Sequence, residues 1–110
     1  MTINLNKSAG ILSLTSRMSG CLRNLTDIDK QMLRDAIVEE YKAINIYEQM
    51  ANSTENLELK KIFLHVAKEE KHHIGEFEKM LESTDVEHRE SVSDGKQEAV
   101  DTLLSKEDLD

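Results

Sequence analysis

Apolar residues recur every three or four positions in two long stretches of the chain, a spacing that predicts two α-helices. The first stretch runs from about residue 27 to residue 51 and the second from about 55 to 82. The apolar positions of the first are Leu33, Ala36, Ile37, Ala43, Ile44, Tyr47, Met50 and Ala51. Those of the second are Leu57, Ile62, Phe63, Val66, Ala67, Ile74, Phe77, Met80 and Leu81. Two long helices joined by a few polar residues predict an antiparallel helical hairpin over residues 27–83.

Short polar residues mark where the expected helices begin and end. Thr26 or Asp27 can cap the first helix, and Ser53 or Thr54 can cap the second. Residues 84–110 are expected to hold a short helix after Asp85, a loop at 93–95, a second brief helix at 96–104 and an acidic tail. Residues 1–26 are rich in Ser, Asn and Thr, and they are expected to form a flexible arm with a short helix at 11–25.

The composition favours an all-α fold and excludes several classes of function. The chain has no proline and only four glycines, and helix-forming residues dominate its middle. A net charge of −8 leaves no basic patch for nucleic acid, and no apolar run approaches the ~20 residues that span a bilayer. Cys21 is the only cysteine and no signal peptide is recognised, so a soluble protein in a reducing cytoplasm is expected.

Three polar residues interrupt the apolar stripes, and they carry the candidate chemistry. Glu40 lies among the apolar positions of the first helix, and Glu70 and His73 lie among those of the second. A carboxylate buried without a partner is costly, and neither stripe has a Lys or Arg nearby. One interpretation is an ordinary hairpin whose core polar groups are hydrogen-bonded. The other is a metal site.

The spacing favours the metal site. Glu70-x-x-His73 places a carboxylate and an imidazole on one face of a helix, as in ferritin-like di-iron bundles, where a Glu from a facing helix completes the set. Such ligands suit iron or manganese better than structural zinc. Glu40, Glu70 and His73 supply about half of a two-metal site. Two hairpins related by a two-fold axis would supply the whole set, which predicts a homodimer that forms a four-helix bundle.

Other polar residues give weaker signals. Tyr47 lies two turns after Glu40, where it either packs in the seam or places its hydroxyl near the metals. A second set of imidazoles and carboxylates recurs every three or four residues on the outward face of the second helix. It predicts either a solvated polar face or a shallow second metal site. That set is His65, Glu69, His72 and Glu76.

Both helices resemble those of a known family, the encapsulated ferritins. The similarity lies in the stretches LRDAIVEEYKAINIYEQMA, residues 33–51, and VAKEEKHHIGEF, residues 66–77. It implies a two-helix half-ferritin that forms a ring-shaped decamer, a pentamer of dimers. It also implies a di-iron ferroxidase site across each dimer interface, with Glu40, Glu70 and His73 as ligands and Tyr47 near the metals. Such proteins oxidise Fe(II) and store the mineral inside an encapsulin nanocompartment in the cytoplasm.

The chain departs from this family pattern in two places. Some members carry acidic residues beside the ligand Glu that are proposed to draw iron in; Glu39 is present here, but Lys42 occupies another such position. Members also end in a targeting peptide, which residues 100–105 match only weakly. Two competing hypotheses stay open: a rubrerythrin-like di-iron peroxidase, and a non-enzymatic adaptor formed by a metal-stabilised helical dimer.

Overall fold

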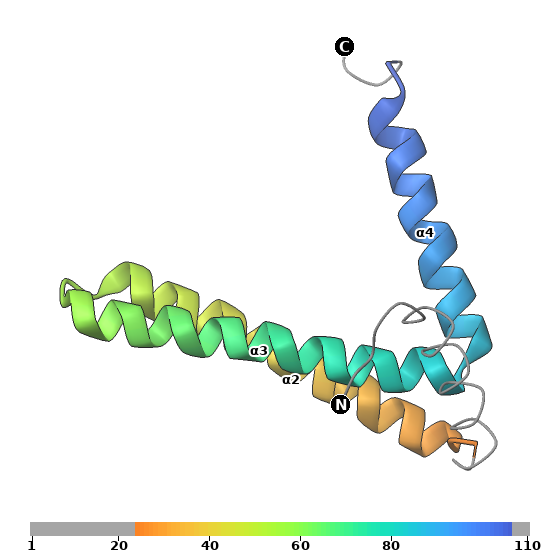
Figure 1. Cartoon of the computed structure of the whole chain (residues 1–110), viewed down its shortest axis with the longest axis horizontal. Coiled ribbons are helices and arrows are strands. Elements are labelled where there is room, and N and C mark those ends of the chain that lie inside the picture. Colours follow the sequence, from red (N-terminus) through yellow and green to blue (C-terminus); the bar gives the residue numbers. More distant parts are fainter. Residues whose placement is uncertain (1–23, 107–110) are drawn as a thin grey trace, which may run out of the picture. The chain divides into compact units, whose positions relative to one another are not determined.

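A computed structural model describes residues 24–106, and in that range it contains three α-helices and no β-strand. Helix α2 is Asp27–Ser53, α3 is Leu57–Thr84 and α4 is Val86–Leu104. Helices α2 and α3 lie side by side and run antiparallel (Figure 1), so the predicted all-α fold and the hairpin are confirmed. Up to residue 23, the predicted arm and its short helix, together with Cys21, lie outside the described residues.

The start of α2 follows the sequence prediction. The Thr26 Oγ1 accepts the Asp29 backbone N–H at 3.1 Å, and the Asp29 Oδ2 accepts the Thr26 N–H at 3.0 Å. This reciprocal pair satisfies two backbone donors that a helix start otherwise leaves free. Thr26 is therefore the cap.

The cap of α3 is Asn56, so the prediction of Ser53 or Thr54 was wrong. The Asn56 Oδ1 accepts the Leu59 N–H at 2.8 Å. Ser53 still belongs to α2, where its hydroxyl donates to the Gln49 carbonyl at 2.9 Å. Thr54 accepts from the Asn56 N–H at 3.1 Å and so shapes the turn. The hydroxyl groups of Ser53 and Thr54 are thus already hydrogen-bonded at the end of α2 and in the turn, and they do not cap α3.

The core of the hairpin is thin. In the described range the buried apolar residues are Ile37, Ile44, Ala51, Ala67 and Leu81. The small side chains of Ala51 and Ala67 let the two helices approach closely. Across the hairpin, the Lys71 Nζ donates to the Glu48 Oε2 at 3.1 Å. A core of this size leaves much apolar surface exposed, which favours further burial against another chain.

Truncating the core at Ile44 is expected to destabilise the hairpin. Ile44 is buried, so Ile44→Ala leaves a cavity and should lower the free energy of unfolding by about 2–4 kcal/mol. Urea denaturation of the metal-free protein at one fixed protein concentration measures this loss. Val38→Ala on the same helix is the control, because Val38 is exposed and its truncation should cost below about 0.5 kcal/mol. Equal losses in the two variants would contradict this account of the core.

Helix α4 is one continuous helix, which corrects the prediction of a loop at 93–95 followed by a separate short helix. Asp85 caps it, since its Oδ1 accepts the His88 N–H at 3.0 Å, as predicted for Thr84-Asp85. The helix continues through Gly95, whose φ is not positive. A single glycine costs about 1 kcal/mol inside a helix, and the neighbouring Lys, Gln, Glu and Ala outweigh it.

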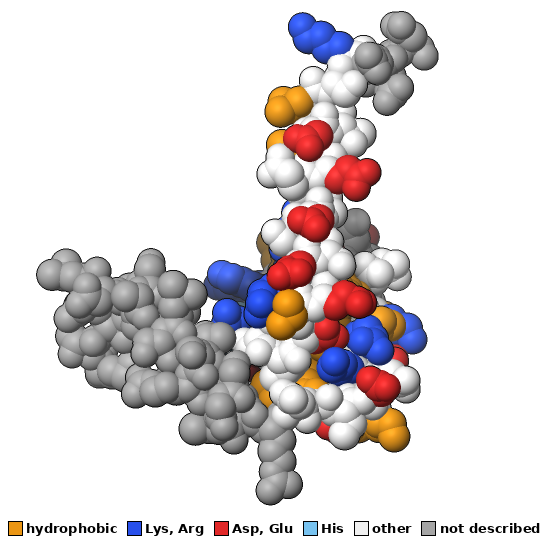
Figure 2. Space-filling view, turned by 90° about the vertical axis from the view of Figure 1, so that its right-hand side faces the viewer, with side chains coloured by type: hydrophobic (Ala, Val, Ile, Leu, Met, Phe, Trp, Pro, Cys, Tyr) orange, Lys and Arg blue, Asp and Glu red, His pale blue; other side chains and the backbone are white. Residues whose placement is uncertain are grey.

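No residue of α4 is buried, and Figure 2 shows acidic side chains at successive levels along it. The hairpin, Asn24–Leu81, is one compact unit and the residues from Glu82 onward belong to another, so α4 is described by itself. In the described part of the chain, no helix has the length and apolar character needed to cross a membrane.

Candidate metal centre

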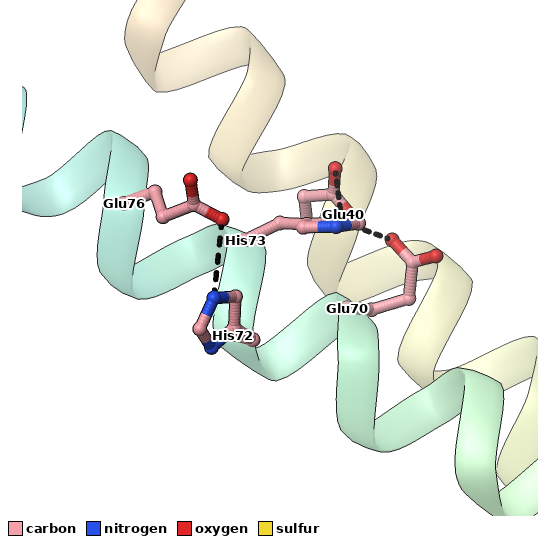
Figure 3. A network of polar contacts seen from close by, with 5 residues as sticks. All are labelled: Glu40, Glu70, His72, His73 and Glu76. Carbon is pink, nitrogen blue, oxygen red and sulfur yellow. Dashed lines mark ion pairs between the residues drawn. The ribbon is translucent and has the colours of Figure 1, made fainter.

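The hairpin brings the three predicted ligand residues together near the middle of both helices. Glu40 projects from α2, and Glu70 and His73 project from α3 one turn apart (Figure 3). One ligand atom from each of the three lies within 4.8 Å of the others. Within residues 24–106 no other group of three or more His, Cys, Asp or Glu side chains comes together in this way.

The distances within this cluster suit a shared cation. The His73 Nδ1 lies 3.6 Å from the Glu40 Oε1 and 3.6 Å from the Glu70 Oε2. Both exceed the usual 2.7–3.2 Å of an N–H···O hydrogen bond. Atoms that bind one metal at about 2.1 Å are separated from one another by about 3.0–3.5 Å. The side chains are therefore close to the spacing of a ligand set.

The carboxylates of this cluster are largely buried, which costs free energy unless their charge is compensated. The side chains of Glu40 and Glu70 are each only 18% exposed, and that of His73 is 44% exposed. The Glu40 Oε2 is buried with no hydrogen-bond partner. No Lys or Arg of the described chain pairs with either carboxylate. A buried carboxylate oxygen without a partner costs free energy, and a bound cation would remove that cost.

An open cavity leads to this cluster. It has a volume of about 400 Å³ and is lined by Glu40, His73, Glu76 and Phe77, and it is called the site cavity below. Its spacing predicts that Glu76 lies on the outward face of α3. Its position three residues after His73, nearly one turn, was the signal that it also borders the ligand cluster.

Tyr47 packs within the hairpin. Its ring stacks on that of Phe63 with centroids 6.2 Å apart and an angle of 22° between the planes. The contact accounts for its place on the apolar stripe, and a role near the metals stays a prediction.

The outward-facing residues form two separate pairs. The His65 Nε2 lies 2.9 Å from the Glu69 Oε1, and the His72 Nε2 lies 3.4 Å from the Glu76 Oε1. All four side chains are exposed, and no three of their ligand atoms converge. The equally spaced pair Glu69-x-x-His72 thus does not converge with Glu40 as Glu70 and His73 do. Whether this face is a solvated polar face or a second metal site stays a prediction.

Glu39 also lies on the surface, where it has a basic partner. The Lys42 Nζ lies 3.2 Å from the Glu39 Oε1, and both side chains are largely exposed. Lys42, which departs from the family pattern, therefore pairs with Glu39, which matches that pattern. This pairing offsets the charge that a cation approaching Glu39 would meet.

Comparison with known proteins identifies relatives of this chain. The family model named Rubrerythrin matches residues 31–108. A ferritin-like–encapsulin shell fusion protein of Pyrococcus furiosus is 46% identical over 68 residues, which are 62% of this chain and 20% of that protein. The chain therefore spans about a fifth of the length of this curated relative. The crystal structure of an encapsulated ferritin domain from the same organism shares 41% identity, covers 70% of this chain and 80% of its own, and gives a TM-score of 0.64.

Proposed function

Because the chain belongs to the encapsulated ferritin family, we propose that it is a ferroxidase. The match to the rubrerythrin family model places it among the ferritin-like proteins. It oxidises Fe(II) to Fe(III) with dioxygen at a two-iron site formed by two copies of the chain. Members of these families are often di-iron oxidoreductases. The observation that carries the proposal is the Glu40 carboxylate, which converges with Glu70 and His73 and has a buried Oε2 without a hydrogen-bond partner.

The donor set fits iron. Two carboxylates and one imidazole are the oxygen-rich, nitrogen-containing ligands of ferritin-like sites, in contrast to the thiolates of structural zinc. One chain supplies three such side chains, which are too few for two metal ions. A two-fold axis past Glu40 doubles the set to two facing Glu residues and two Glu-x-x-His pairs, the complement of a di-iron bundle.

Exposed apolar residues support a dimer on this face. Ile62, Val66, Glu70 and His73 follow one another at steps of three or four along α3, and Ile62 is more than half exposed in the single chain. On α2 a second line of exposed residues lies roughly 80–120° around the helix from Glu40. It consists of Ile28, Met32, Ile46 and Met50. Covering both lines with a second hairpin buries apolar surface and encloses the cluster at once.

Each residue has a distinct role in the proposed site. Glu40 of each copy bridges the two ferrous ions, while Glu70 and His73 hold one ion each. When both ions are bound, each gives up one electron and dioxygen accepts the pair. The carboxylates favour oxidation because negative ligands stabilise Fe(III) more than Fe(II). The protein holds two ions close together and leaves coordination positions open for dioxygen.

The oxidised iron needs a container, and an encapsulin shell is the proposed one. The curated relative joins a ferritin-like part to an encapsulin shell in one protein. In this proposal the ferritin-like hairpins work inside such a compartment as a pentamer of dimers. Residues 100–105 are the candidate targeting segment, since Leu103 and Leu104 at the end of α4 are strongly exposed.

An air pulse after anaerobic loading tests the function. Two Fe(II) per dimer are expected to bind without oxygen, and air should then produce the ferric absorbance within seconds. The rubrerythrin match favours one rival, a peroxidase, for which hydrogen peroxide would act much faster than air. If Fe(II) binds but neither air nor hydrogen peroxide oxidises it rapidly, both enzyme hypotheses are contradicted and the non-enzymatic adaptor is favoured.

A further inference from the structure

We infer that Glu76 is the carboxylate that captures Fe(II) from solvent and passes it through the site cavity to Glu40 and His73. This inference rests on the proposed function and names the route by which its substrate enters. Glu76 is the titratable residue that lines the site cavity without belonging to the converging ligand group. It is a positioning residue for the substrate, not a ligand of the final site.

Exposure falls in steps along the site cavity. The Glu76 side chain is 64% exposed, His73 is 44% exposed and Glu40 is 18% exposed. In Figure 3 the Glu76 carboxylate lies beside the stem of His73, on the other side from Glu40 and Glu70. A cation that meets Glu76 is still hydrated, and the next oxygen and nitrogen donors are deeper in the same cavity. The arrangement therefore leads from solvent to the buried ligands.

The charge around this route is favourable to a cation. The residues that line the site cavity include two carboxylates and no Lys or Arg. The neighbouring hollow, lined by His65, Lys68, Glu69, His72 and His73, contains a lysine. The other candidate entry residue, Glu39, is paired with Lys42. Glu76 has only a 3.4 Å contact with His72, through Oε1.

The position of Glu76 keeps it accessible in the proposed dimer. Glu76 follows the buried Ala67 by nine residues, which is two and a half helical turns, so it lies on the opposite side of α3 from the seam with α2. It also lies roughly 60° around the helix from His73, towards the rim of the proposed dimer face. The rim stays open to solvent when the face itself is covered.

Glu76→Gln tests the route, with Glu58→Gln as the matched control. Glu58 is an exposed carboxylate on the same side of α3, five turns and roughly 27 Å away from Glu76. Stopped-flow mixing with Co(II) under argon measures cation capture from the visible absorbance of the bound ion, without any oxidation. The association rate constant of Glu76→Gln is expected to fall about three- to tenfold at low ionic strength, and that of Glu58→Gln to change by less than about 1.5-fold.

Salt and saturation separate capture from a structural effect. The difference between wild type and Glu76→Gln should shrink as salt screens the charge. Saturating Fe(II) should restore the wild-type oxidation rate, and both proteins should bind the same number of ions. A lower number of bound ions in Glu76→Gln would overturn the inference, because Glu76 would then be a ligand. A difference that salt does not reduce would also overturn it.

Glu39→Gln decides between the two routes. Because Lys42 already offsets its charge, the loss of capture rate should be smaller than in Glu76→Gln; the reverse order would overturn the inference. Failure of the entry route and failure of the ferroxidase proposal give different results. Co(II) capture that depends on Glu76 in a protein without fast iron oxidation would contradict the ferroxidase alone. Wild-type capture by Glu76→Gln in an active ferroxidase would contradict the route alone.

Discussion

Replacing Glu40 by Gln is expected to lower the rate of Fe(II) oxidation by more than about a hundredfold, since even residues that only support metal ligands change affinity or activity by about 10–100-fold. The single substitution removes a charge from both halves of the proposed site, and Glu40 bridges the two ions there. Stopped-flow absorbance after an air pulse measures the rate, and circular dichroism checks that the protein stays helical. Glu48→Gln is the control, because Glu48 lies on the same helix outside the cluster and pairs with Lys71.

The stability of the same variant separates a metal site from an ordinary polar core. Wild-type Glu40 has a buried oxygen with no partner, so the metal-free protein bears a cost that the neutral amide reduces. Metal-free Glu40→Gln should therefore melt at the same temperature as wild type or higher. If Glu40 were a satisfied core residue, the variant would be less stable and equally active. That outcome, or a wild-type oxidation rate, would contradict the proposed site.

The sequence was sufficient to identify the cluster because the chemistry and the periodicity agree there. Glu69-x-x-His72 and Glu70-x-x-His73 have identical spacing, and only the apolar neighbours Val66 and Phe77 indicate which pair faces the seam. The structure places the second pair opposite Glu40. The hairpin could be predicted for the same reason, since a stripe of apolar residues determines which faces of two helices meet.

The errors came from residues whose effect depends on a local competition. Gly95 resembles a loop signal, yet its good helix-forming neighbours carry α4 through it. Ser53 resembles a cap, yet α2 extends far enough to use its hydroxyl for the Gln49 carbonyl. Glu76 belongs by spacing to a polar face, yet it also lies nearly one turn after His73, and the cavity in the structure shows that it borders the ligand cluster as well. The pattern of residues along the chain does not show which of two competing local interactions is the stronger.

Dimerisation is a condition for catalysis in this proposal, so breaking the dimer without touching a ligand should abolish rapid oxidation. Ile62→Asp is designed for this. Ile62 is 57% exposed in the single chain, so a charge there is tolerated by the hairpin itself. In the proposed dimer the same position is covered, and each copy would bury an uncompensated carboxylate. Burying such a charge costs several kcal/mol, which raises the dimer dissociation constant by at least about a hundredfold.

Leu64→Asp is the matched control for Ile62→Asp. Leu64 is also on α3 and similarly exposed, at 47%, but it lies two residues on, which places it about 200° around the helix and away from the dimer face. Sedimentation velocity should show a smaller assembly than wild type for Ile62→Asp and a wild-type assembly for Leu64→Asp, with equal helicity in both. Rapid Fe(II) oxidation should be lost only in the first, although its Glu40, Glu70 and His73 are intact. If a monomeric Ile62→Asp protein still oxidises iron rapidly, one hairpin with its three ligand side chains is enough for the reaction. That result would contradict the proposed two-chain site.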